Sequence, residues 1–433
     1  MNNPANAFRK FLLLWSGQFI SAIGSGLTAF GLGVYVFEQT GMASATALVT
    51  LLAFMPSLLL SAVAGVLADR YDRRLLLVLG DGLSAMGLVF ILICMLQGDV
   101  QLWQICLGVT ISSVFSSLLD PAFKATVTDL LTEEQYTKAS GLVQVASSAK
   151  FLISPILAGV LLAYSDIKLL LLIDICTIVV TVACTLVVRK GLEAKKYEQE
   201  AKSFLREFQD GWSAITADRG VLVLVMMTSV MVFFIGFIET LAVPMVLAFT
   251  DSAALGTVIT IAASGMLVTS LLIGVLPVKK GFAKVLSLSL FGAGLFMALF
   301  GMRENIVWIC VSGFLFFAML PLVNSSLDYL IRTNIANSVQ GRAWGLIGVI
   351  SQLGYVVAYA SSGVLADFVF TPLLVDGGLL ENSVGTLIGT GSGRGTGLLI
   401  MIAGGLLCVT AVVLYRLRSV RRLESKGLLY GTE

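Results

Sequence analysis

Charged side chains inside long apolar runs are the residues of this sequence that could do chemistry. Glu239, Asp174 and Asp328 lie in such runs, and Lys150 lies in another. A charge inside a membrane helix costs about 2.5–3.5 kcal/mol, and a carboxylate loses its charge when it takes up a proton. The three carboxylates are therefore candidates for proton coupling. Glu239 comes first because no basic residue lies within two turns of it along the chain; a structural ion pair is the alternative for each.

Several other chemistries are excluded by what the sequence lacks. It has no histidine, so His-based triads and HExxH zinc sites are ruled out. The dipeptide Gly-Lys never occurs, so there is no P-loop. The six cysteines lie in apolar runs without disulfide or CxxC spacing. No enzymatic activity, metal site or cofactor is expected, and a net charge of +2 argues against a nucleic-acid partner.

Two stripes of polar residues follow one helical face each, with members at i, i+3, i+7 and i+10. Such stripes could hydrogen-bond a large amphipathic substrate, and packing between helices is the alternative. No dense cluster of Arg or Lys accompanies them, which argues against multiply charged anions. The stripes are Gln18, Ser21, Ser25 and Thr28 in one run, and Gln352, Tyr355, Tyr359 and Ser362 in another.

The composition indicates that membrane-spanning helices position these residues. The chain has 433 residues, of which 57% are hydrophobic and 12% are charged, against about 25% charged in an average soluble domain. Only helices satisfy their backbones across lipid at these lengths, so an all-α polytopic membrane protein is expected. The twelve predicted spans are 11–37, 44–68, 75–96, 102–124, 139–163, 168–188, 220–248, 253–276, 282–301, 306–330, 343–366 and 396–415.

The distribution of basic residues predicts the orientation. With the N-terminus inside, 24 of the 28 Lys and Arg fall on the inner side and three fall outside. Both termini are therefore expected in the cytoplasm. The charged segment 189–219 is expected to link two six-helix halves, 1–188 and 220–416, with a basic tail over 417–433. Within it, Phe204, Leu205, Phe208, Trp212 and Ile215 recur at helical spacing, which predicts an amphipathic helix on the membrane face or a plain stiff linker.

The two halves repeat one another weakly. KASGLV (138–143) resembles RAWGLI (342–347), and AGVLLA (158–163) resembles SGVLAD (362–367) at the same offset of 204 residues. Internal duplication is the usual construction of secondary transporters. Outside this repeat, the glycine-rich segment 367–397 contains GTGSGRGTG (389–397). No strand is predicted before it, so we expect a flexible loop rather than a phosphate cradle.

The segment GVLADRYDRRLLL, between the second and third spans, resembles the signature loop of the major facilitator superfamily. Gly65, Asp69, Arg70 and Arg73 match its pattern, and Asp72 stands where glycine is usual. The resemblance implies a conformational latch at the cytoplasmic side. From the residues themselves, Gly65 is expected to let helices approach closely, and Asp120 and Asp81 to be acidic partners of the basic loop.

The fifth span, GLVQVASSAKFLISPILAG, resembles half of the antiporter motif of drug-exporting facilitators. Gly141, Pro155 and Gly159 match, whereas Lys150, Ser154 and Ala158 replace glycines. A proline-kinked helix packed through small residues is the alternative. The chain as a whole resembles the macrolide-efflux branch, in segments such as DPAFKATVTDLLTEEQYTKASGL and FLREFQDGW.

These resemblances imply a secondary active exporter of amphipathic small molecules, of macrolide or multidrug type, that works by proton antiport. Export of a siderophore or other metabolite, and lysolipid flipping, are the alternatives. A membrane sensor without transport is disfavoured by the intact signature loop. The expected partners are the substrate, protons and membrane lipid. The expected location is the bacterial cytoplasmic membrane, and the expected state is a monomer.

Overall fold

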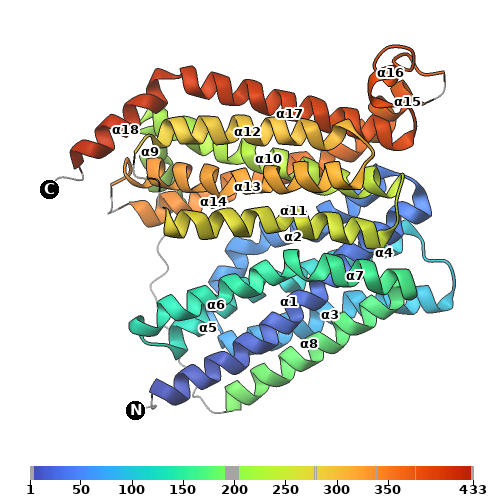
Figure 1. The fold of residues 1–433 in the computed structure, drawn as a ribbon. Helices are drawn as coiled ribbons and strands as arrows, with labels where there is room; N and C mark the ends of the chain where they lie inside the picture. The colour runs from blue at the N-terminus through green and yellow to red at the C-terminus, as the bar shows by residue number, and fades with distance from the viewer. Residues whose placement is uncertain are drawn as a thin grey trace. The chain divides into compact units, whose positions relative to one another are not determined.

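The computed structural model describes residues 4–190, 204–276, 278, 280–336, 339–375 and 377–430 (Figure 1). Every regular element among them is a helix. Twelve helical stretches in this described part are long and apolar enough to cross a membrane. The expected all-α polytopic fold with twelve spans is therefore confirmed, and the chain is a multi-pass membrane protein. The contacts divide it into two compact units, each described below by itself.

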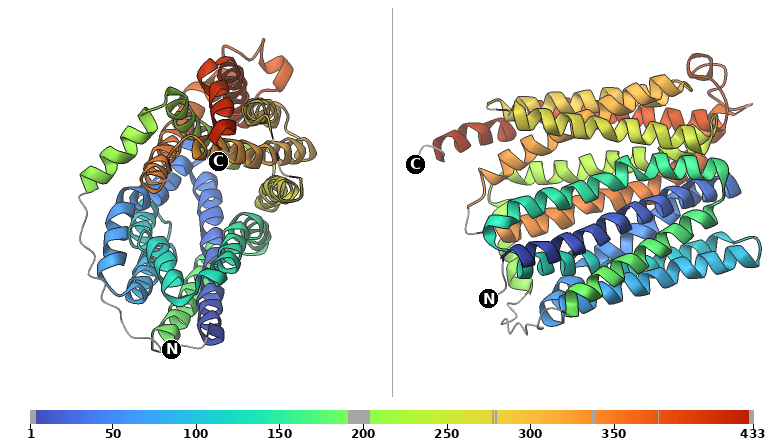
Figure 2. Two further views of the ribbon diagram at one scale, coloured as in Figure 1. Left: turned by 90° about the vertical axis from the view of Figure 1, so that its left-hand side faces the viewer. Right: turned by 60° about the horizontal axis from the view of Figure 1, so that its bottom comes forward.

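Unit 1 comprises Met1–Gly41, Leu48–Glu200 and Asp251–Thr257. In it, α1 packs along α8, and α3 packs on α4, α5 and α8; the right-hand view of Figure 2 shows α1 and α8 side by side. Its helices are α1 (Pro4–Thr40), most of α2 (Ala43–Arg70), α3 (Arg73–Gln97), α4 (Leu102–Ser116), α5 (Leu119–Leu130), α6 (Glu133–Leu152), α7 (Ser154–Tyr164) and α8 (Ile167–Lys190).

Two predicted single spans of unit 1 are each broken into two helices. The fourth span is divided between α4 and α5 near Ser117, and the fifth between α6 and α7 at Ile153. Pro155 lies in the first turn of α7, where its missing N–H leaves no hydrogen bond unmade. The sequence predicts a kink at Pro155, and the structure has a boundary between two helices there. Lys150, which precedes the boundary, lies on α6.

Unit 2 comprises Met42–Ala47, Ala201–Thr250 and Val258–Glu433. In it, α12 packs on α13 and α17, and α10 packs on α14. Its helices are α9 (Phe204–Thr216), α10 (Arg219–Leu247), most of α11 (Ser252–Val275), α12 (Phe282–Met302), α13 (Ile306–Arg332), α14 (Gln340–Leu365), the π-helical η1 (Ala366–Phe370), α15 (Thr371–Leu374), α16 (Gly385–Ile388), α17 (Ser392–Arg416) and α18 (Arg418–Tyr430).

Backbone-to-backbone packing brings neighbouring helices of each unit close together. A Cβ added to Gly87 on α3 would lie 2.2 Å from the Gly108 carbonyl on α4. In unit 2, a Cβ added to Gly354 on α14 would lie 2.1 Å from the Ser229 carbonyl on α10. Only glycine fits at such contacts, which is how helices associate in lipid without a hydrophobic driving force.

Two helices begin in one unit and continue in the other. The first turn of α2 belongs to unit 2, where the Asp367 carboxylate accepts hydrogen bonds from the Ala43 N–H (3.0 Å) and the Ser44 N–H (2.7 Å). These N–H groups have no partner within α2, so Asp367 serves as its N-terminal cap. The first turn of α11 belongs to unit 1, where a Cβ on Gly159 of α7 would lie 2.5 Å from the Ser252 carbonyl.

The glycine-rich stretch 389–397 is not the flexible loop that the sequence predicts. α17 begins at Ser392, and Arg394 in its first turn is 1% exposed. The Arg394 guanidinium donates hydrogen bonds to the carbonyls of Gly301 (3.1 Å) and Met302 (2.8 Å) at the end of α12. A cation there satisfies the free carbonyls of the last turn and complements the helix dipole. The glycines let α17 begin directly against α12.

The predicted amphipathic segment is the helix α9, which packs on α14 and α10. Ile215 is fully buried and Trp212 is exposed, while the side chains of Phe204, Leu205 and Phe208 lie outside the described part. The tail is also helical over α18. Its Glu424 accepts hydrogen bonds from the N–H groups of Gly281 (2.6 Å) and Phe282 (3.0 Å) at the start of α12.

Candidate functional site

A cavity of about 650 Å³ lies within unit 1, and we refer to it as the polar cavity. The predicted stripe Gln18, Ser21, Ser25 and Thr28 lies in its wall, as the helical spacing of those residues requires. Further hydroxyls come from α2, α3, α4 and α6, and apolar patches separate them. Its size and mixed lining suit a drug-sized amphipathic molecule. The hydroxyl-bearing residues beyond the α1 stripe are Thr50, Ser57, Ser84, Ser112, Ser113, Ser116 and Ser147.

Asp81 faces the polar cavity from α3 and is 1% exposed. The Gln18 amide donates a hydrogen bond of 3.5 Å to its carboxylate. The predicted role of Asp81 as a partner of the basic loop is wrong. Asp81 lies eight residues beyond Arg73, about 12 Å further along the helix at 1.5 Å per residue, and its side chain contacts α1 instead.

Asp174 faces the same cavity from α8 and is 2% exposed. The positive charge of Lys150 on α6 acts on it, so these two predicted residues are brought together. Gly24 on α1 makes room for Asp174 and Thr177, because an added Cβ would lie 2.8 Å from an Asp174 carboxylate oxygen and 2.2 Å from the Thr177 hydroxyl.

Glu239 lies in unit 2 on α10 and is exposed. It accepts a hydrogen bond of 2.9 Å from the Tyr359 hydroxyl on α14. The rings of Tyr355 and Tyr359 stack with their centroids 5.4 Å apart. The second predicted stripe thus meets the first predicted coupling residue. Glu239 is exposed in the described structure, whereas Asp174 is buried.

Asp328, the third coupling candidate, lies on α13 in an ion pair with Arg332. The pair joins residues four apart on one helix at 3.2 Å, and the two side chains are 49% and 60% exposed. Exposed pairs of this kind contribute about 0–1 kcal/mol.

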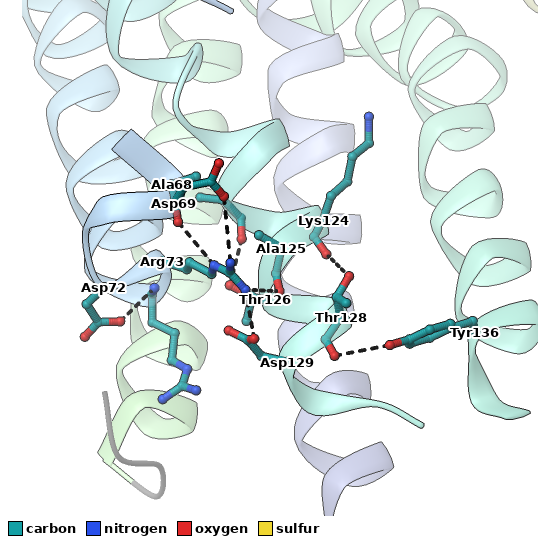
Figure 3. Close-up of polar contacts among 12 residues, drawn as sticks. Ala68, Asp69, Asp72, Arg73, Lys124, Ala125, Thr126, Thr128, Asp129 and Tyr136 are labelled. Atoms are coloured by element: carbon teal, nitrogen blue, oxygen red, sulfur yellow. Dashed lines mark hydrogen bonds and ion pairs between the residues drawn. The ribbon is translucent and has the colours of Figure 1, made fainter. Parts of the chain in front are cut away.

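The signature loop gathers around Arg73 at the start of α3 (Figure 3). Its guanidinium pairs with Asp129 of α5 at 2.8 Å and with Asp69 of α2 at 3.9 Å. It also donates hydrogen bonds of 3.1 Å each to the carbonyls of Ala68 and Ala125. We refer to these groups as the Arg73 cluster, which ties the ends of three helices together within unit 1.

Asp129 is the member of the Arg73 cluster that the sequence analysis missed. Its position in the sequence could have indicated this role, because Asp129 lies nine residues after Asp120, at the end of the same span. The predicted Asp120 pairs instead with Lys124 at 2.7 Å, and both side chains are mostly exposed. The two residues are four apart on α5 and therefore meet on one face of that helix. Asp120 thus pairs within its own helix and not with Arg73.

Two glycines of the motifs do not make the contacts expected of them. In the described part of the chain, no atom lies within 4 Å of a Cβ added to Gly65 or Gly141. The expected close helix approach at Gly65 is therefore not found, and Arg70 is exposed. Asp72, which replaces the usual glycine, caps α3 through the Arg74 N–H (3.0 Å) and pairs with Arg189 at 3.0 Å.

Comparison with known proteins gives a family and a fold. The model of the Major Facilitator Superfamily matches residues 14–359. Macrolide efflux protein A of Streptococcus pyogenes is 25% identical over 368 residues, covering 83% of this chain and 89% of that protein. The enterobactin exporter EntS of Citrobacter koseri is 29% identical over 157 residues, or 36% of this chain and 37% of EntS.

A solved structure shares the fold across almost the whole chain. The crystal structure of a bacterial homologue of the human lysosomal transporter Spinster matches with a TM-score of 0.71 at 14% sequence identity. The match covers 98% of this chain and 99% of that one. At this identity the likeness concerns architecture alone, and it agrees with twelve spans.

Proposed function

Because the chain belongs to the major facilitator superfamily and is therefore a transporter of small molecules, we propose that it is a secondary active exporter of amphipathic compounds, driven by proton entry. The observation that carries the proposal is the polar cavity. It combines a large apolar wall with the hydroxyls of the α1 stripe and with buried carboxylates that could take up protons.

Similarity to macrolide efflux protein A over 83% of the chain supports export and a substrate of similar character. A siderophore is the second candidate substrate, and the partial similarity to the enterobactin exporter supports it. Both kinds of molecule are large and carry many hydrogen-bonding groups, which the serines of the polar cavity would match.

For proton coupling, the structure offers two sets of residues. Glu239 with Tyr359 lies in unit 2, and Asp174 with Lys150 lies in unit 1. Both sets are candidates, because Glu239 accepts a hydrogen bond from Tyr359 and Asp174 is buried in the wall of the polar cavity. The Arg73 cluster would then act as the conformational latch that the family resemblance implies.

We further propose that the protein is a monomer in a bacterial cytoplasmic membrane with both termini inside. The excess of Lys and Arg in the segments assigned to the inner side supports this orientation. Bacterial relatives of the chain support the assignment to a bacterial membrane.

Cellular accumulation of a compound panel tests the proposal. Cells that express the protein should accumulate less of at least one macrolide or other amphipathic compound than cells with an empty vector. Collapse of the proton gradient with an uncoupler should remove the difference. Equal accumulation for every compound contradicts export, and a difference that survives the uncoupler contradicts proton coupling.

A further inference from the structure

Three exposed arginines gather where α17 meets α18 in unit 2. α17 ends at Arg416, Leu417 is extended, and α18 begins at Arg418, so α18 turns away from the line of α17 (Figure 1). The Arg421 guanidinium donates a hydrogen bond of 3.5 Å to the Arg416 carbonyl and lies over the Tyr415 ring, 5.6 Å from its centre. The charge of Arg421 is therefore held at the end of α17. We refer to Arg416, Arg418 and Arg421 as the arginine junction.

No acid neutralises the arginine junction within the described part of the chain. None of its three residues forms an ion pair there. α17 has no Asp or Glu. The one acid of α18 is Glu424, and its carboxylate accepts from the N–H groups of Gly281 and Phe282 at the start of α12.

The acids of the neighbouring helices are also bound elsewhere. α18 packs on α10, α12, α13 and α17, and α12 contains no Asp or Glu. Asp328 of α13 pairs with Arg332, and Asp218 caps the first turn of α10. The acid within α10, Glu239, accepts from Tyr359 of α14. Like charges that lie together without an acid repel one another, so an anion from outside the chain is the partner that fits them.

An apolar stripe on α17 leads to the arginine junction. Its members are spaced four, three and four residues apart, so they share one helical face, and Arg416 continues that face. All of them are exposed, and α17 is one of the twelve candidate spans, so lipid acyl chains cover the stripe. The apolar stripe consists of Ile402, Leu406, Val409 and Val413.

We propose that the arginine junction binds the phosphate of an anionic phospholipid whose acyl chain lies along the apolar stripe of α17. The site is separate from the polar cavity and does not depend on what the protein transports. A guanidinium has five N–H donors and can form two parallel hydrogen bonds with one phosphate, which suits Arg416 and Arg421 to this ligand. A zwitterionic headgroup carries its own positive charge, which the arginines repel, so the site should prefer an anionic headgroup.

The packing of α18 holds the arginine junction in place. Val420 and Leu423, on the opposite face of α18, are buried. A Cβ added to Gly220 would lie 2.8 Å from Leu423, so α18 rests directly on α10. The hydrogen bonds of Glu424 fix α18 to α12 as well. The basic face is thus ordered before any lipid binds, which lowers the entropic cost of binding.

Native mass spectrometry of the full-length protein tests the inference by counting bound lipids. The probes are phosphatidylglycerol and phosphatidylcholine with identical acyl chains. Phosphatidylglycerol should bind at least about tenfold more tightly, and a higher ionic strength should reduce the difference. Inorganic phosphate should not displace it at equal concentration, because phosphate has no acyl chain to place on the apolar stripe.

Variants test the assigned residues. Arg416→Gln and Arg421→Gln should each lower the affinity for phosphatidylglycerol about fivefold, and the double variant should bind both lipids equally. The double replacement by lysine keeps the charge and should keep a preference for phosphatidylglycerol. Arg332→Gln is the matched control. Arg332 is also an exposed arginine over an aromatic ring, 5.7 Å from the centre of Trp344, but it is already paired with Asp328.

Photochemical cross-linking locates the lipid. Phosphatidylglycerol with a diazirine in its acyl chain should label α17 near Val409 and Val413, and unlabelled phosphatidylglycerol should suppress the labelling better than phosphatidylcholine does. Equal binding of the two lipids overturns the inference, as does a preference that survives in the double glutamine variant. An equal loss in Arg332→Gln would show that net charge alone attracts the lipid. Labelling only outside α17, or a dimer that covers α17 and excludes lipid, also overturns it.

The double lysine variant keeps the test decisive if the double glutamine variant does not fold. All three arginines are exposed, so both variants should unfold in lipid-free detergent at the temperature of the wild type. If the folded lysine variant binds both lipids equally, the positive charge at the arginine junction does not select the headgroup, and the inference fails.

Discussion

The Tyr359 hydroxyl on α14 donates a hydrogen bond of 2.9 Å to the Glu239 carboxylate on α10. The two helices also touch where Gly236 lies beside Ala358, since a Cβ on Gly236 would come within 2.8 Å of the Ala358 Cβ. The hydrogen bond therefore joins α10 and α14 where their backbones already lie close together. A hydrogen bond to a charged group contributes about 1.5–3 kcal/mol, so the charge of Glu239 is coupled to the packing of α10 on α14.

Replacement of this carboxylate tests whether it couples transport to protons. Glu239→Gln imitates the protonated form and keeps an oxygen that accepts from Tyr359, so substrate binding should be retained while gradient-driven accumulation is lost. Tyr359→Phe should lower accumulation about tenfold because it removes the donor. Flux into proteoliposomes with and without a pH gradient measures both. Normal gradient dependence in Glu239→Gln would move the coupling site to Asp174.

The Arg73 cluster predicts two separable effects. Asp69→Asn should cut transport strongly, because it removes a charge of the proposed latch. Membrane insertion should stay intact, because Asp69 is 61% exposed and its contact with Arg73 is long, at 3.9 Å. Asp129→Asn should lower the free energy of unfolding by about 1–3 kcal/mol, since it leaves the half-buried Arg73 without its 2.8 Å partner.

Asp120→Asn is the matched control for the Arg73 cluster. It removes an exposed pair of the same helix, so the free energy of unfolding should change by less than about 1 kcal/mol. Thermal unfolding in detergent and uptake assays on equal amounts of protein measure these effects. Equal destabilisation by Asp120→Asn and Asp129→Asn would argue against the cluster.

Replacement of Arg394 in unit 2 should lower the stability of the protein. Arg394→Met should destabilise the protein by about 3–5 kcal/mol, because the buried guanidinium satisfies two carbonyls at the end of α12 and pairs with Glu304 at 3.7 Å. Arg303→Met, at an exposed neighbouring arginine, should change the free energy of unfolding by less than about 0.5 kcal/mol. Similar unfolding temperatures for the two variants would remove the assigned role of Arg394.

Reporter fusions test the proposed orientation. An enzyme active only outside the cytoplasm should be active when fused after the predicted outer turns and inactive after the predicted inner ones. A reproducible reversal at any position would contradict the proposed orientation. The outer positions are Gln39, Asp99, Asp166, Asp251 and Glu304; the inner positions are Asp72, Glu134 and Lys280.

Hydropathy predicts the spans because each must be apolar over its whole length, whatever it packs against. Helical spacing also predicts the α1 stripe, since residues three or four apart lie on one face of any α-helix. The stripe consists of Gln18, Ser21, Ser25 and Thr28. These features follow from local rules.

The partners of charged residues do not follow from such rules. Asp81 lies in the first half of α3 and Asp129 near the end of α5, yet one lines the polar cavity and the other binds Arg73. Their assignment depends on how α1, α3 and α5 are rotated against one another, and no sequence spacing reports that rotation. Arg394 was missed for the same reason, because its partners on α12 lie more than 90 residues away.

The division of α2 and α11 between the two units bears on where a boundary in this chain can be drawn. The boundary falls inside helices, between Ala47 and Leu48 and between Thr257 and Val258, and not only in the linker. Each of these helices is anchored at its first turn to one unit and along the rest of its length to the other. Ala45 and Ala53 therefore belong to different units, although only about two turns of one helix separate them. A boundary placed only in the segment 189–219 would separate the first turns of α2 and α11 from the residues that hold them.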